Sequence, residues 1–191
     1  MLKSALRAQP DFPEASAALG SSLLLTGRLD ESLQITEKGL GAHPESAELH
    51  NMHGLVLMAR SRPKEAEAEH RKALSLRADY LDARLNLAIA LVLENRAAEA
   101  LPEFHKVLRD EPQNLKAQAN LASALMDLGR YEEASAAFAR AVELAPKDAD
   151  LRTNLGLALR RAGREEEARK AFEEAERLRS ATPKRTAAKP Q

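Results

Sequence analysis

Three histidines are the side chains in this sequence whose types and spacing could do chemistry. His50 and His53 lie one helical turn apart, and His70 follows in the next predicted helix. Neutral imidazoles bind Zn²⁺, so three converging rings would form a zinc site. No carboxylate or other partner beside them is evident that would orient the rings. We therefore interpret His53 and His70 as imperfect core residues and predict no metal site.

The other residue types offer less chemistry. The chain has no cysteine, which excludes disulfides, thiolate metal sites and cysteine nucleophiles. No Ser/His/Asp arrangement, paired acidic site or phosphate-binding loop stands in a concave, non-repeating context. We therefore predict that the protein is not an enzyme and that it needs no cofactor.

Charge and hydropathy restrict the classes of partner. The 191 residues include 29 Lys and Arg and 29 Asp and Glu, so the formal net charge is zero. A balanced chain gives no electrostatic reason to bind nucleic acid. No apolar run approaches the roughly 20 residues that span a bilayer. The N-terminal MLKSALRAQPDF has no secretory apolar region, which predicts a cytoplasmic protein unless the native N-terminus lies upstream.

A repeat of 34 residues organises the whole chain. Proline recurs on this period, and glycine, alanine or another small residue recurs at other fixed places. A period of 34 residues is typical of helix-turn-helix repeats. The prolines on the grid are Pro10, Pro44, Pro112 and Pro146. When proline is placed at repeat position 32, the five full repeats are 13–46, 47–80, 81–114, 115–148 and 149–182.

Each repeat position has a physical reason. Positions 8 and 20 are small in every repeat, which lets two antiparallel helices approach closely. Positions 7 and 11 carry the apolar stripe. Position 24 carries a large side chain that fills the space between the two helices, which we call the plug; it is Phe104, Phe138 or Phe172 in the last three repeats. Position 15 follows the first helix and requires a residue that tolerates positive φ.

An arginine at position 16 and a glutamate at position 19 recur in all five repeats, Arg130 and Glu133 being one pair. The glutamate falls in the first turn of the second helix, where the helix dipole favours an anion. We interpret the pairs as helix capping and exposed ion pairs, with a functional arginine ladder as the alternative.

The two ends of the array differ. Residues 1–12 fit the second helix of a preceding repeat, either as a minimal cap or as the remnant of a longer chain. At the other end Glu176 replaces the apolar residue of position 28, as a terminal repeat requires. Residues 183–191 are basic and contain proline, which predicts a disordered tail.

These residues resemble the tetratricopeptide repeat family. The shared pattern is Leu followed by Gly or Ala at positions 7 and 8, a small residue at 20, Phe at 24, Ala at 27 and Pro at 32, and it covers essentially residues 1–182. The resemblance implies an all-α, right-handed superhelical solenoid of helix-turn-helix repeats with a concave groove lined by the first helices. The aromatic residue that the family places at position 4 is replaced by Ser16, His50, Arg84, Gln118 and Arg152.

The family geometry would place positions 2, 5, 6, 9, 12 and 13 of each first helix on the groove. The resulting candidate peptide-binding residues are Leu24, Leu55, Met58, Leu85, Asn86, Ile89, Val92, Asn120, Met126, Asn154 and Arg160. The same positions also hold Leu25, Leu93, Ser123, Asp127, Leu157 and Arg161. An apolar strip with adaptable methionines is suited to a peptide or a partner helix.

Three asparagines share position 6, namely Asn86, Asn120 and Asn154. Their amides could hold the backbone of an extended peptide, although solvated asparagines would give the same pattern. The clamp with which some family members hold the C-terminal carboxylate of chaperones needs basic residues that the matching positions here do not supply. We therefore expect a different ligand.

The resemblance implies a scaffold that binds a peptide or a partner protein segment in the concave groove. The alternative is the repeat arm of a larger glycosyltransferase-like or secretion-system protein that recruits substrates. A third hypothesis is self-association through the N-terminal helix.

Overall fold

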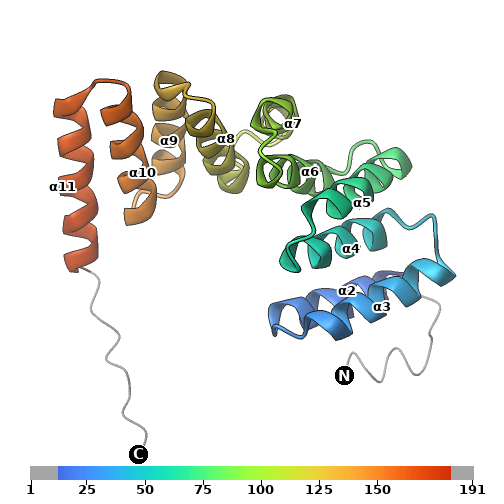
Figure 1. Cartoon of the computed structure of the whole chain (residues 1–191). Coiled ribbons are helices and arrows are strands. Elements are labelled where there is room, and N and C mark those ends of the chain that lie inside the picture. Colours follow the sequence, from blue (N-terminus) through green and yellow to red (C-terminus); the bar gives the residue numbers. More distant parts are fainter. Residues whose placement is uncertain (1–12, 182–191) are drawn as a thin grey trace, which may run out of the picture. The chain divides into compact units, whose positions relative to one another are not determined.

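The computed structural model describes residues 13–181, and every regular element in that range is an α-helix (Figure 1). None of these helices is long and apolar enough to cross a membrane. The predictions for residues 1–12, including self-association, and for the tail 183–191 lie outside the described residues. The all-α helical-repeat fold predicted from the sequence is confirmed.

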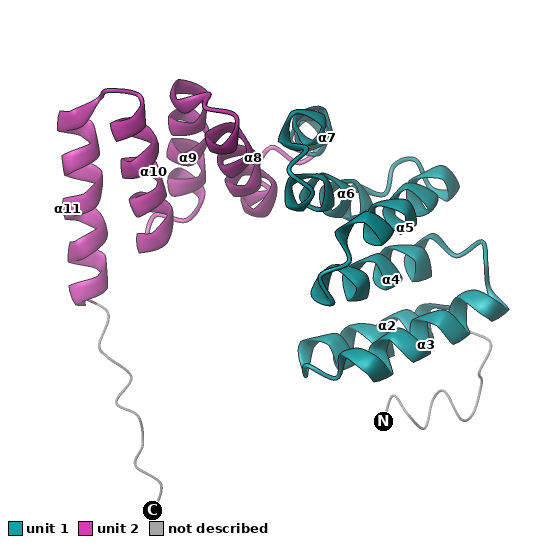
Figure 2. Cartoon of the chain, in the orientation of Figure 1, with its two compact units in different colours: residues 1–110 teal, residues 111–191 magenta. Residues whose placement is uncertain are grey.

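The chain divides into two compact units, residues 1–110 and 111–191, which we describe separately (Figure 2). In the first unit the helices are α2 (Pro13–Leu25), α3 (Leu29–Ala42), α4 (Ala47–Ala59), α5 (Pro63–Leu76), α6 (Leu81–Leu93) and α7 (Ala97–Asp110). The second unit has α8 (Leu115–Asp127), α9 (Tyr131–Leu144), α10 (Ala149–Arg161) and α11 (Glu165–Ala181). Each first helix packs against the second helix that follows it, and α2, α4 and α6 also pack in succession.

The small residues at position 8 make room for the large side chain at position 24 of the same repeat. A Cβ atom added to Gly54 would lie 2.6 Å from the His70 ring, and one added to Gly156 would lie 2.7 Å from the Phe172 ring. Gly20 faces Thr36 in the same way. The close approach predicted from the small residues is therefore the contact of a helix backbone with the plug of its partner helix.

The turn inside each repeat has the left-handed residue that the sequence predicts at position 15. The φ angles there are 72° at Gly27, 58° at Ser61, 61° at Asn95, 71° at Gly129 and 79° at Gly163. Glycine and asparagine tolerate this region, whereas serine carries the usual steric cost of a side chain there. The turn before α5 is therefore the most strained of the five.

All five Arg–Glu pairs form. Each arginine donates from Nε and Nη2 to the two carboxylate oxygens of its glutamate, at distances between 2.5 and 2.8 Å. Both partners are substantially exposed, so solvent screens each pair and its contribution to stability is small. The geometry supports the interpretation of these pairs as structural elements of the turns.

One of these arginines also holds a buried carboxylate. Arg96 donates from Nη1 to both carboxylate oxygens of Glu67 on α5, at 2.9 and 2.8 Å, and Arg71 also pairs with Glu67. Only 7% of the Glu67 side chain is exposed. Burial acts to raise the pKa of Glu67, but the hydrogen bond from Arg96 and the charges of Arg71 and Arg96 outweigh it, so the pKa lies below its usual value.

Candidate functional site

The three histidines singled out from the sequence have separate partners. His50 bonds through Nδ1 to Glu69 (2.6 Å) and through Nε2 to the Pro44 carbonyl (2.9 Å). His53 bonds through Nδ1 to the Thr36 hydroxyl at 2.9 Å, and His70 is fully buried as the plug of its repeat. A search of residues 13–181 finds no group of three or more His, Asp or Glu side chains placed to hold a metal ion.

In three repeats, the polar residue at position 4, which is His50, Arg84 or Arg152, bonds to a carbonyl of the preceding repeat where the family has an aromatic ring. Arg84 donates to Glu103 (2.7 Å) and to the Ala78 carbonyl (2.6 Å), which ends the preceding repeat. His50 reaches the equivalent carbonyl of Pro44. These hydrogen bonds take the place of aromatic packing and satisfy carbonyls at the end of a helix pair.

We expect His53→Leu to reduce the pH dependence of stability. Burial lowers the pKa of His53, so the unfolded chain takes up its proton first and stability falls as the pH drops below about 6.5. Leucine occupies this repeat position in the other four repeats, and Thr36 keeps its bonds to the Ser32 and Leu33 carbonyls. Urea unfolding of both proteins at about pH 7.5 and about pH 5.5 measures the effect. If the free energy of unfolding changes equally between the two pH values in both proteins, His53 does not cause the pH dependence.

The first helices of unit 1 carry an apolar surface, which we call the unit 1 face. It consists of Leu24 and Leu25 on α2, Leu55 and Met58 on α4, and Ile89, Val92 and Leu93 on α6. Leu25 is 85% exposed and Leu93 is 55% exposed, whereas the other five side chains are partly buried. The exposed positions of α3, α5 and α7 are instead mostly charged, polar or alanine. The unit 1 face is therefore an apolar surface that the described residues leave open.

Two predicted groove residues in this unit are buried. Leu85 is 4% exposed and Asn86 is 5% exposed. The Asn86 amide donates to the Asn51 side chain at 3.1 Å, and Asn51 donates to the Tyr80 hydroxyl at 3.3 Å. Asn86 is thus engaged in a hydrogen-bond chain within the fold, and Leu85 contributes to the core.

In unit 2 the structure brings predicted groove residues together around a pocket of about 230 Å³, which we call the unit 2 pocket. It lies among α8, α9 and α10 and is lined by Ser123, Met126, Asp127, Phe138, Asn154 and Leu157. Met126 and Asn154 were predicted from different repeats and here share one pocket. Sequence reasoning missed Phe138 as a pocket wall because its repeat position predicts core packing alone; the phenylalanine is 3% exposed.

The asparagines at position 6 do not have equivalent roles. Asn120 donates to the Lys116 carbonyl of its own helix at 2.8 Å, and Asn86 is buried. Asn154 lines the unit 2 pocket, and its side chain has no hydrogen bond to another described residue. Of the three, Asn154 is therefore the amide best placed to meet a ligand.

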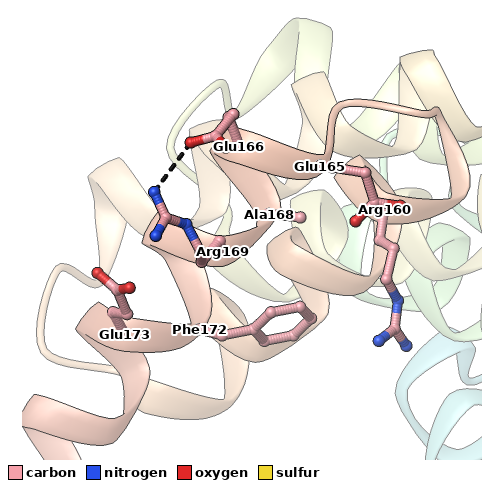
Figure 3. Close-up of a pocket in the computed structure, with 7 residues that line it drawn as sticks. All are labelled: Arg160, Glu165, Glu166, Ala168, Arg169, Phe172 and Glu173. Atoms are coloured by element: carbon pink, nitrogen blue, oxygen red, sulfur yellow. Dashed lines mark hydrogen bonds and ion pairs between the residues drawn. The ribbon is translucent and has the colours of Figure 1, made fainter.

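Arg160, the last predicted groove residue, lies at a different pocket. Figure 3 shows it with Phe172 at the end of the array, beside Glu165, Glu166, Ala168, Arg169 and Glu173. Its guanidinium carbon lies 5.5 Å from the Phe172 ring centroid, and Arg169 bonds to Glu166 at 2.9 Å. Arg160 therefore covers the partly exposed plug of the last repeat and does not line the unit 2 pocket.

Comparisons with known proteins agree with the helix-pair geometry. Three tetratricopeptide repeat models match the sequence, one over residues 1–55 and 91–152, one over 51–114 and one over 137–170. No curated protein sequence matches significantly.

Solved structures share the fold. The crystal structure of YrrB, described as a TPR protein with an unusual peptide-binding site, is 21% identical, with 94% of this chain and 93% of that chain covered and a TM-score of 0.75. The crystal structure of MamA protein gives 20% identity, 94% and 98% coverage and a TM-score of 0.78. MamA 41-end from Desulfovibrio magneticus RS-1 gives 20% identity, 90% and 97% coverage and a TM-score of 0.82. At these identities the likeness concerns the fold.

Proposed function

Because the chain belongs to the tetratricopeptide repeat family, we propose that it is a protein-interaction scaffold that binds a peptide or partner protein segment on its first helices. The observation that carries this proposal is the unit 1 face, where the most exposed leucines, Leu25 and Leu93, adjoin five partly buried apolar side chains. Exposed apolar side chains gathered on one set of helices are typical of a protein-binding site. YrrB, which shares the fold, is itself described as having a peptide-binding site.

The chemistry of the unit 1 face indicates the kind of ligand. Leucine, isoleucine, valine and methionine offer contact area and no hydrogen bonds, so the ligand must supply apolar side chains. Met58 can adapt its shape to the ligand because its side chain is unbranched and flexible. We propose that a segment with apolar residues on one side, as in an amphipathic helix, binds here.

The unit 2 pocket would bind one side chain of a peptide ligand. Its wall is apolar and its rim carries the Asn154 amide, which can both donate to and accept from a peptide backbone. Small-molecule sites usually measure roughly 300–1,000 Å³, so a pocket of about 230 Å³ suits one side chain better than a cofactor.

Selection of a random linear-peptide library on the immobilised chain tests the proposal without a known partner. We expect peptides with spaced apolar residues to be enriched and to bind the chain in fluorescence polarisation. Ile89→Arg should weaken the binding of such a peptide about tenfold or more, because an unpaired charge would face the apolar ligand.

Ala98→Arg is the matched control, since Ala98 is exposed on α7, a second helix of the same unit. It adds the same charge away from the unit 1 face and should leave the affinity unchanged. An equal loss in both variants would place the binding site elsewhere, and a library that yields no specific peptide would contradict the proposed function.

A further inference from the structure

The unit 2 pocket combines an apolar wall with an acidic rim. Met126, Phe138 and Leu157 form the wall, while Ser123, Asp127 and Asn154 supply the polar atoms. The Ser123 hydroxyl donates to the Ala119 carbonyl at 3.1 Å, so its remaining capacity is to accept. Of the residues that line the pocket, only Asp127 is charged, and its charge is negative.

The Asp127 carboxylate lies at a helix end where a negative charge is unfavourable. It is the last residue of α8, whose last turn contains no basic residue. The C-terminal end of a helix favours a cation and disfavours an anion. The equivalent residue of α10 follows that rule, since it is Arg161. Among residues 13–181 the exposed Asp127 side chain has neither an ion pair nor a hydrogen bond. A bound cation would relieve this arrangement.

The two nearby arginines do not supply that cation. Arg161 lies over the Tyr131 ring, with its guanidinium carbon 5.9 Å from the ring centroid, and Arg160 lies over Phe172. Neither lines the unit 2 pocket. Among the described residues neither arginine forms an ion pair with Asp127, so the carboxylate is available to a ligand cation.

We propose that the unit 2 pocket is a specificity site that accepts one lysine or arginine side chain of a bound peptide. The aliphatic stem packs on Met126, Phe138 and Leu157, and the cationic end pairs with the Asp127 carboxylate. Long basic side chains combine an apolar stem with a charged end in this way, and a charge-assisted hydrogen bond to a carboxylate is stronger than a neutral one. This inference rests on the proposed peptide-binding function and adds a side-chain preference to it.

Parallel library selections on the wild-type chain, Asp127→Asn and Glu143→Gln test the preference. Glu143 is an exposed residue of α9 with no ion pair to another described residue, so its variant removes one negative charge from the same unit away from the pocket. We expect a lysine or arginine at a fixed place in the peptides selected by wild type and Glu143→Gln, and none in those selected by Asp127→Asn.

A charge-neutral analogue of arginine distinguishes binding in the unit 2 pocket from non-specific electrostatic attraction. Replacing the selected arginine by citrulline should weaken binding to wild type about tenfold and should have no effect on binding to Asp127→Asn. Selected peptides without a fixed basic residue, or an equal citrulline effect in both proteins, would overturn the preference while leaving peptide binding intact. Failure to select any peptide would overturn peptide binding as well.

Discussion

Phe138→Ala should lower the free energy of unfolding by about 3–5 kcal/mol, the usual cost of removing a fully buried aromatic side chain. Phe138 is 3% exposed in the interior of unit 2, and the residue at position 8 of its repeat, Ala122, is too small to fill the space. Urea unfolding followed by circular dichroism measures the loss. Tyrosine fluorescence is a second signal, to which Tyr80 of unit 1 and Tyr131 of unit 2 contribute, since the chain has no tryptophan.

Phe172→Ala is the matched control, because Phe172 has the same repeat position in the last helix pair. Its ring is only partly buried, so less apolar surface returns to water and the loss should be about 1–2 kcal/mol. Equal losses for the two variants would contradict the assignment of Phe138 as the plug of an interior repeat and Phe172 as that of a terminal one.

Arg96→Gln should destabilise unit 1 by about 2–4 kcal/mol, although the same change at an ordinary turn arginine is nearly neutral. The substitution leaves the buried Glu67 carboxylate with Arg71 as its remaining cationic partner, beside the carboxyl group of Glu94, and an incompletely paired buried charge is costly. Arg130→Gln in unit 2 is the comparison, because the described partner of Arg130 is the exposed Glu133. That variant should have nearly the stability of the wild type, because solvent screens the exposed pair.

Two further measurements identify Glu67 as the cause. Because the folded-state pKa of Glu67 is depressed in the wild type, its stabilisation is present above about pH 4.5 and is lost as the pH falls through the folded pKa. The wild-type advantage over Arg96→Gln should therefore shrink in acid. Adding Glu67→Leu should recover much of the loss, since leucine occupies this position at Leu33 and Leu101. The pKa of Glu99 is also lowered by its hydrogen bond from Arg96, so the Glu67→Leu variant is what separates the two carboxylates. Little recovery with Glu67→Leu would mean that the Arg96–Glu99 turn pair matters more.

The fold follows from the sequence because its rules are local and repeated. The 34-residue period gives ten helices in the described range, and the first helices of the five repeats start at Pro13, Ala47, Leu81, Leu115 and Ala149. A residue that tolerates positive φ, such as Gly129, is needed at a turn whatever lies elsewhere in the chain. The same holds for the Arg130–Glu133 pair, whose members lie three residues apart.

Side-chain partners across repeats were less predictable. The burial of Asn86 depends on Asn51, 35 residues away, and the pairing of Arg96 with Glu67 depends on a partner 29 residues away. A repeat position predicts the location of the backbone. It does not predict which long side chains from other repeats contact the residue. For this reason position 6 predicted three equivalent amides, whereas the structure gives Asn86, Asn120 and Asn154 three different environments.

The candidate site was predictable at the level of helix faces. Leu24, Leu55, Met58, Ile89 and Val92 have the partial exposure expected of groove-lining residues, and Met126 and Asn154 share a pocket. The side chain of Arg160 lies over the ring of Phe172, which is partly exposed and attracts the cation. The residue type alone does not reveal that contact.

Methionine-methyl NMR with a selected peptide tests the central claim most directly. Met58 belongs to the unit 1 face and Met126 to the unit 2 pocket, while Met52 is buried and serves as the internal reference. We expect the peptide to shift the Met58 or Met126 methyl signal with the same dissociation constant as in fluorescence polarisation, and to leave Met52 nearly unchanged. Saturable binding that moves neither Met58 nor Met126 would contradict a binding site on the first helices.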